Sequence, residues 1–187
     1  MTLPDDLRRT ALAEFASAGY AATSLQRIAD LAGTSKASVL YHFVSKEHLL
    51  DAVISPALED MTMFIDSMTV DSFAPSSRAA FVERFVDFLL AHRQVVHLVI
   101  NQGATLEDVP VIHRTLDQIR RLASFFDIAA GSTVEKLRFG IALGGAAYCL
   151  AAADELGVDQ AESAGELREA LITVISQLLV PLPTAAV

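Results

Sequence analysis

Residues 23–43 limit the possible folds of this chain more than any other segment, because they hold two short helical patterns around one tight turn. Thr23 and the glutamine three positions later fit a capping box, which predicts a helix that begins after Thr23. Gly33 predicts the turn, and Ser35 predicts the N-cap of a third helix that extends to about Phe43. Two short helices around a three-residue turn form a helix-turn-helix, whose second helix can enter the major groove of DNA.

Helices this short are unstable alone and need neighbours to pack against. A first helix is predicted over about residues 5–18, where an apolar residue recurs every four positions, at Leu7, Ala11 and Phe15. A fourth helix is predicted to begin after the N-cap Ser45 and to extend into the high 60s. The core of this N-terminal region is also expected to contain Leu25, Ile28, Val39 and Phe43.

The rest of the chain is predicted to be helical as well. Alanine and leucine dominate it, runs of strand-favouring residues are scarce, and tryptophan is absent. Helices are expected after Pro75 and over about residues 95–100, 108–126, 133–155 and 163–180. The longest apolar stretch, residues 139–153, is shorter than the roughly 20 residues of a membrane span and is therefore predicted to be a buried helix. The expected fold is all-α, with about nine helices.

The acidic charge of the chain is unevenly distributed. The net charge is −9, yet residues 1–50 hold five basic and five acidic groups, and residues 23–46 alone carry +2. A mildly basic head can therefore contact phosphates while an acidic body repels DNA elsewhere. Cys149 is the only cysteine, which excludes an internal disulfide and suits a reducing compartment. The N-terminus has neither the basic nor the apolar region of a secretory signal, so the expected location is the cytoplasm.

Three segments around the predicted helix-turn-helix resemble one known family. Residues 21–29 match the second helix of the TetR family of bacterial regulators, residues 32–43 match its turn and recognition helix, and residues 45–50 match the start of its fourth helix. The resemblance covers roughly 45 residues and is carried by their order and spacing. It implies an N-terminal DNA-binding domain over residues 1–48 and a helical ligand-binding and dimerisation domain over residues 49–187.

The resemblance also implies a role for each matching residue. Residues at the start of the second helix would grip a phosphate, those that open the recognition helix would face base edges, and those near its end and at the fourth helix would contact phosphates. The candidate DNA-binding residues are Thr23, Ser24, Ser35, Lys36, Ala37, Ser38, Tyr41, His42 and Lys46. Lys36 is the expected base reader, because its ammonium can donate to guanine O6 and N7.

One position departs from the family pattern. Many members carry an aromatic residue where this chain has Leu40, which is expected to be a core residue here and not a DNA contact. This departure and the modest charge leave open an alternative, in which the chain is a helical ligand-binding or adaptor protein with a non-functional DNA head. Otherwise, the resemblance implies a homodimeric repressor that binds a palindromic operator and is released by a small molecule.

The body is expected to supply the dimer contact and the ligand pocket. Gly140, Gly144 and Gly145 lie in one of the last two long helices, where glycine costs about 1 kcal/mol relative to alanine, so another backbone or a ligand is expected to approach closely. The family pairs these two helices into a four-helix bundle across a two-fold axis. A small hydrophobic ligand is expected, with candidate contacts Phe85, Phe88, His97, Asn101, Gln102, His113, Phe126 and Tyr148.

No motif in the chain predicts an enzyme, a cofactor or a metal site. His92 and His97 are five residues apart and do not share a helix face as two metal ligands would. Cys149 lies in a segment of alanine and glycine without a nearby base, which indicates a buried, inert thiol. The chain also has no glycine-rich phosphate loop and no G-x-S-x-G motif. The expected partners are double-stranded DNA, a second copy of the chain and the ligand, with no membrane.

Overall fold

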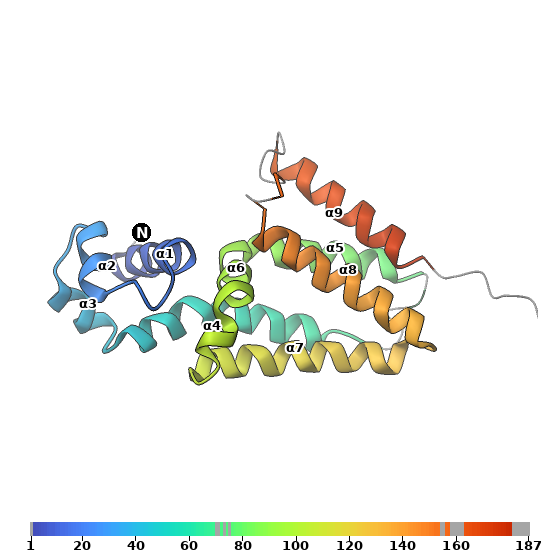
Figure 1. Ribbon diagram of the computed structural model, residues 1–187, viewed down its shortest axis with the longest axis horizontal. Helices are drawn as coiled ribbons and strands as arrows, with labels where there is room; N and C mark the ends of the chain where they lie inside the picture. The colour runs from blue at the N-terminus through green and yellow to red at the C-terminus, as the bar shows by residue number, and fades with distance from the viewer. Residues whose placement is uncertain are drawn as a thin grey trace, which may run out of the picture. The chain divides into compact units, whose positions relative to one another are not determined.

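The computed structural model describes residues 2–69, 72, 74, 76–153, 156–157 and 163–180. These residues form nine α-helices, the 3-10 helix η2 and no strand, so the predicted all-α fold is confirmed (Figure 1). Pro75, expected to open a helix, lies outside the described residues. The elements are α1 (Leu3–Ser17), α2 (Leu25–Leu31), α3 (Lys36–His42), α4 (Lys46–Asp66), α5 (Arg78–Ala91), α6 (Arg93–Gln102), η2 (Gly103–Leu106), α7 (Pro110–Ala129), α8 (Thr133–Ala151) and α9 (Ala164–Leu178).

The chain packs as two compact units that do not follow its order in sequence. The first unit combines Met1–Thr62 with His92–Gln118, and the second combines Met63–Ala91 with Ile119–Val187. The first therefore contains α1, α2, α3 and α6, and the second contains α5, α8 and α9, while α4 and α7 contribute residues to both. This division describes packing, and the predicted functional boundary after residue 48 stays a prediction.

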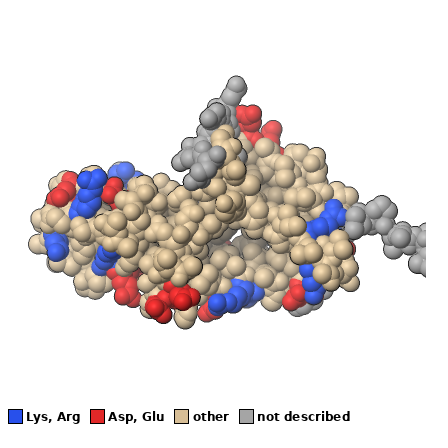
Figure 2. All heavy atoms as spheres, in the orientation of Figure 1, with Lys and Arg blue, Asp and Glu red and all other residues tan. Residues whose placement is uncertain are grey.

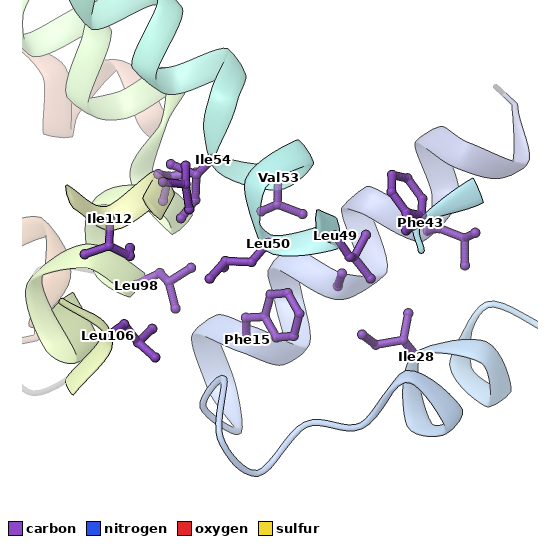
Figure 3. Packing of buried hydrophobic residues seen from close by; sticks show 14 of the residues in the cluster. Phe15, Ile28, Phe43, Leu49, Leu50, Val53, Ile54, Leu98, Leu106 and Ile112 are labelled. Carbon is purple, nitrogen blue, oxygen red and sulfur yellow. The ribbon is translucent and has the colours of Figure 1, made fainter. Parts of the chain in front are cut away.

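The core of the first unit forms around one face of α1. Leu7, Ala11 and Phe15 are fully buried, which confirms the four-residue stripe predicted from the sequence. In Figure 3, Phe15 lies among Ile28, Leu49 and Leu50, which come from α2 and α4. Each such side chain contributes roughly 1.5–3 kcal/mol by leaving water. Short helices that are unstable alone are thereby held by a core that they share with α1 and α4.

Helix α6 adds a part of this core that the sequence pattern did not predict. Leu98 of α6 is fully buried, and it packs in one cluster with Leu106 of η2 and Ile112 of α7 (Figure 3). Helix α6 also packs directly against α1. The helix-turn-helix therefore shares its hydrophobic core with residues that lie far along the chain.

The second unit is held by packing of α9 against α5 and α8 and by a row of phenylalanine rings. Phe81 and Phe85 stack with their centroids 6.2 Å apart, and Phe126 stacks on Phe139 at 5.0 Å. The C-terminal carbonyl groups of α9 accept hydrogen bonds from arginine side chains. Arg78 donates to Leu179 and Arg138 donates to Leu178, which satisfies groups that a helix end leaves without an intrahelical partner. None of the helices described has the length and apolar character required to cross a membrane.

An ion pair joins α5 to α9 on the surface of the second unit. Arg168 donates from two nitrogens to the Asp87 carboxylate, at 2.6 and 3.0 Å, and these hydrogen bonds hold the pKa of Asp87 below its usual range. We expect Asp87→Asn to lower the free energy of unfolding by less than about 1 kcal/mol, because the pair is exposed to solvent. A lowered carboxyl pKa stabilises the folded state above about pH 4, and this contribution is lost as the pH falls further. Urea unfolding at pH 7 and pH 3 checks this expectation. The difference in the free energy of unfolding between wild type and Asp87→Asn should shrink at pH 3.

Candidate nucleic-acid interface

Helix α2 is capped by Ser24, one residue later than the sequence predicted. The Ser24 hydroxyl oxygen accepts a hydrogen bond from the backbone N–H of Arg27 at 3.1 Å. Thr23 is instead 2% exposed, and its hydroxyl donates to the carbonyl of Gly19 at 2.8 Å. The predicted capping box is therefore wrong, because burial turns the Thr23 side chain toward the end of α1. Gln26 donates to Asp30 one turn along α2.

The turn between α2 and α3 depends on Gly33. Its φ of +66° lies in the left-handed region that glycine adopts without steric cost. The N–H of Gly33 donates to the Asp30 carbonyl at 3.2 Å, and the N–H of Thr34 donates to the Ala29 carbonyl at 2.9 Å. These two bonds form a Schellman motif, which ends α2 and satisfies its last carbonyl groups. The sequence prediction of a glycine turn is confirmed here.

Helix α3 buries one face and exposes the other. Ser35 caps it by accepting a hydrogen bond from the N–H of Ser38 at 3.1 Å, as predicted. Val39 is fully buried and Phe43 is 4% exposed, so both belong to the core. The exposed face consists of residues at spacings typical of one side of a helix, namely Lys36, Ala37, Leu40 and Tyr41.

Leu40 is a correction to the sequence analysis. It was expected in the core, but 39% of its surface is exposed. Val39 takes the core position, and one further residue along a helix turns the side chain by roughly 100°, toward the face that carries Lys36 and Tyr41. Tyr41 is the most exposed large hydrophobic side chain of this face, at 84%.

Helix α4 begins beside this face with a lysine whose position is fixed by contacts. Ser45 caps α4 by accepting a hydrogen bond from the N–H of His48 at 3.0 Å, as predicted. The Lys46 Nζ lies 4.2 Å from the centroid of the Tyr20 ring and 3.4 Å from the carbonyl oxygen of Ala21. Partial burial lowers the pKa of the Lys46 ammonium. Burial, with the charge of Glu47, raises the pKa of Tyr20.

The predicted DNA-binding residues all belong to the first unit. Eight of them have at least partly exposed side chains, and Thr23 is the exception. The eight are Ser24, Ser35, Lys36, Ala37, Ser38, Tyr41, His42 and Lys46. Basic and acidic side chains are interspersed on the surface over α1, α2 and α3 (Figure 2). Some of these opposite charges form ion pairs, since Arg27 lies 3.2 Å from Glu14.

The predicted ligand-binding residues divide between the two units. His97, Asn101, Gln102 and His113 belong to the first, and Phe85, Phe88, Phe126 and Tyr148 belong to the second. Their environments also differ, since Phe85 is 5% exposed whereas Tyr148 is 58% exposed. Asn101 contacts the His97 ring at 3.2 Å, and the Gln102 amide is bonded to the backbone of α1 and of Tyr20. A common ligand site for these eight residues stays a prediction.

Tyr20 has a place in this interface that the sequence analysis missed. Tyr20 follows the turn at Gly19. The signal that the sequence offered for it was an aromatic residue directly after a glycine. Its contact with Lys46 depends on how α4 folds back against the end of α1, and no local pattern encodes that packing.

The removal of one candidate hydroxyl tests whether Thr23 has a structural role. We expect Thr23→Val to lower the free energy of unfolding by about 1 kcal/mol, because a buried hydroxyl with two carbonyl acceptors is lost. Thr23→Ser keeps the hydroxyl and should lose less. Thermal unfolding of the three proteins measures this order. Equal stability of the valine and wild-type proteins would contradict a structural role for the hydroxyl.

The segment that holds this interface matches a known protein family. The family described as bacterial regulatory proteins, tetR family, matches residues 7–53, which contain α2, α3 and the start of α4. Over these residues, the chain matches the TetR family. The resemblance noted in the sequence is thus confirmed, and a family of regulatory proteins agrees with the expectation that the chain is not an enzyme.

Curated relatives match a segment of similar length. The HTH-type transcriptional regulator RutR of Escherichia coli K12 is 47% identical over 49 residues, and RutR of Shigella flexneri is equally similar. The aligned segment covers 26% of this chain and 23% of each relative, so the chain matches about a quarter of their length.

Solved structures of bacterial regulators match along nearly the whole chain. A TetR-family regulator from Bordetella parapertussis has a TM-score of 0.67 at 19% identity and covers 99% of this chain and 100% of its own. The ketosteroid regulator KstR2 of Mycobacterium tuberculosis has a TM-score of 0.64 at 19% identity, with coverage of 95% and 93%. A putative fatty acid metabolism regulator of Clostridium perfringens has a TM-score of 0.66 at 19% identity, with coverage of 95% and 100%. These likenesses establish a shared fold.

Proposed function

We propose that this protein is a DNA-binding transcriptional regulator, which acts in the cytoplasm as a homodimeric repressor on a palindromic operator. The observation that carries the proposal is the exposed face of α3 with Lys36 and Tyr41, in the same unit as the serine-capped N-termini of α2 and α4. A recognition helix of seven residues, fixed on a shared core, can enter the major groove with its first turn toward the bases.

Each group in this face has a distinct role in the proposal. The Lys36 ammonium donates to guanine O6 and N7, and Ala37 and Ser38 contact the neighbouring base edge. Ser35 also faces the base edges, at the start of α3. Ser24, Tyr41, His42 and Lys46 contact phosphates, which fixes the register of the protein on DNA without reading sequence. Thr23 contributes indirectly, because its buried hydroxyl holds the start of α2 where Ser24 can reach a phosphate.

An apolar stripe on α8 supports the dimer. Val134, Leu137, Ile141 and Tyr148 are each more than half exposed, and their spacing places them on one side of the helix. Gly144 continues this stripe, and a Cβ atom built there or at Gly140 would meet no atom within 4 Å. A second copy could therefore bring its backbone close to α8. A two-fold dimer would present two recognition helices to two half-sites.

Release by a small hydrophobic ligand completes the proposal. The support comes from relatives whose names mention apolar molecules, since KstR2 is named as a ketosteroid regulator and the Clostridium protein as a putative fatty acid metabolism regulator. A ligand weakens DNA binding when it binds better to a conformation whose two recognition helices are wrongly spaced. The free energy by which the ligand shifts this conformational equilibrium cannot exceed the difference between its binding free energies for the two conformations.

A mobility-shift titration tests this function. The DNA is the region upstream of the coding sequence, and random DNA competes at two salt concentrations. A salt-dependent complex that survives the competitor and contains two protomers is the expected result. Addition of fatty acids or steroids should then dissociate it. A folded dimer that binds no DNA at low salt would overturn the proposal and favour the adaptor protein with a non-functional DNA head.

A further inference from the structure

The Gln102 side chain joins the end of α6 to the end of α1 through both ends of its amide. Its Nε2 donates to the Phe15 carbonyl oxygen at 2.8 Å, and its Oε1 accepts from the Tyr20 N–H at 2.7 Å. Between these partners, Gly19 has a φ of +90°, and a Cβ there would lie 3.6 Å from the Gln102 Oε1. The left-handed turn thus directs the Tyr20 N–H toward α6.

The Tyr20 ring lies between the core of the first unit and the surface. One neighbour is the Phe15 ring, at a centroid distance of 5.2 Å and a tilt of 60°. The other is the Lys46 ammonium, 4.2 Å from the ring centroid, a geometry in which the ring attracts the cation. The Lys46 Nζ also lies within 3.4 Å of the Ala21 carbonyl oxygen. The ammonium therefore has a defined place before any DNA binds.

We infer that Gln102 and Tyr20 are positioning residues for the DNA interface, in which the Gln102 amide fixes the backbone at Tyr20 and the Tyr20 ring fixes the Lys46 ammonium beside the N-terminus of α4. This inference rests on the proposed function. A free lysine side chain loses much rotamer freedom when it binds a phosphate, and a lysine already ordered on a ring loses less. Gln102 acts here as a support of the helix-turn-helix.

The position of the Lys46 ammonium can be measured without DNA. The chain has three lysines, so reductive dimethylation with 13C-formaldehyde gives three resolvable lysine signals besides the N-terminus. We expect the Lys46 signal, assigned by its loss in Lys46→Arg, to be shifted upfield by the ring of Tyr20. Tyr20→Leu should return it to the position of an exposed lysine, Tyr20→Phe should keep it, and Gln102→Leu should reduce the shift. The Lys36 and Lys136 signals are internal controls and should not move.

DNA binding supplies the second readout. Tyr20→Leu and Gln102→Leu should weaken binding of specific and random DNA by the same factor, about three- to tenfold. They should also reduce the slope of the logarithm of the DNA-binding constant against the logarithm of the salt concentration, by up to about 0.9 per half-site. Tyr20→Phe should behave as wild type. In a Lys46→Met background the two changes should have no further effect.

The outcomes separate this inference from the proposed function. Absence of DNA binding by the wild-type protein would overturn the proposed function, and the inference with it. A Lys46 signal that is unshifted in a wild-type protein that binds DNA, or unmoved by both Tyr20→Leu and Gln102→Leu, would overturn the inference alone. An unchanged salt dependence in both variants would do the same. If Tyr20→Leu fails to fold, Gln102→Asn replaces it in these measurements. This change keeps the amide but shortens the side chain by one methylene.

Discussion

Replacement of Lys36 and Tyr41 by alanine in one protein is expected to abolish specific operator binding while the protein stays folded. Both side chains are exposed on α3, and Tyr41 is 84% exposed, so their truncation removes no core contact. A good bidentate base contact contributes about 1–3 kcal/mol of discrimination, and a dimer loses it in both half-sites. Together with the lost phosphate contact, we expect affinity for the operator to fall by about 100-fold or more.

The two single variants separate the base contact from the phosphate contact. Lys36→Ala should relax the preference for one base pair in each half-site, whereas Tyr41→Ala should weaken all sequences alike. Fluorescence anisotropy on the operator and on scrambled DNA measures both. Lys136→Ala is the matched control, because this lysine is also exposed but lies on α8, where it pairs with Asp127 at 2.9 Å. Unchanged operator affinity of the folded double variant would contradict the assignment of α3 as the recognition helix.

The helix-turn-helix was predictable because its signals are local. Ser35 caps α3 through a hydrogen bond three residues away, and Gly33 ends α2 through bonds to Ala29 and Asp30. Such signals lie within a few residues of each other and can be read from the order of the chain. The predicted core positions Ile28, Val39 and Phe43 follow from the same short period.

Features that depend on tertiary packing were predicted poorly. Thr23 and Ser24 are both good N-cap residues, and burial of the Thr23 hydroxyl against α1 decides that Ser24 is the cap. Leu40 is apolar yet exposed, because Val39 already fills the core position next to it. The bonds from Gln102 to Phe15 and Tyr20 join segments more than 80 residues apart. No pattern in the sequence reports a contact of that kind.

Replacement of Ile141 by arginine is expected to convert the proposed dimer into a monomer. Ile141 is 61% exposed at the middle of the apolar stripe of α8, so the monomer can accommodate an arginine there. In a two-fold interface through α8, the change would bring two like charges together without water or a counter-charge. An unpaired buried charge costs about 3–5 kcal/mol, which corresponds to at least about a 100-fold weaker dimer.

Sedimentation velocity across a concentration series measures the dimer, and thermal unfolding of the same samples reports the fold. Met63→Arg is the matched control, since Met63 is 62% exposed on α4 and lies outside the stripe. Because one recognition helix reads only a half-site, Ile141→Arg should also weaken operator binding, although every predicted DNA contact is unchanged. A dimer as tight as wild type would exclude this face of α8 from the interface. A monomer that binds the full operator with wild-type affinity would instead show that one half-site is sufficient for recognition.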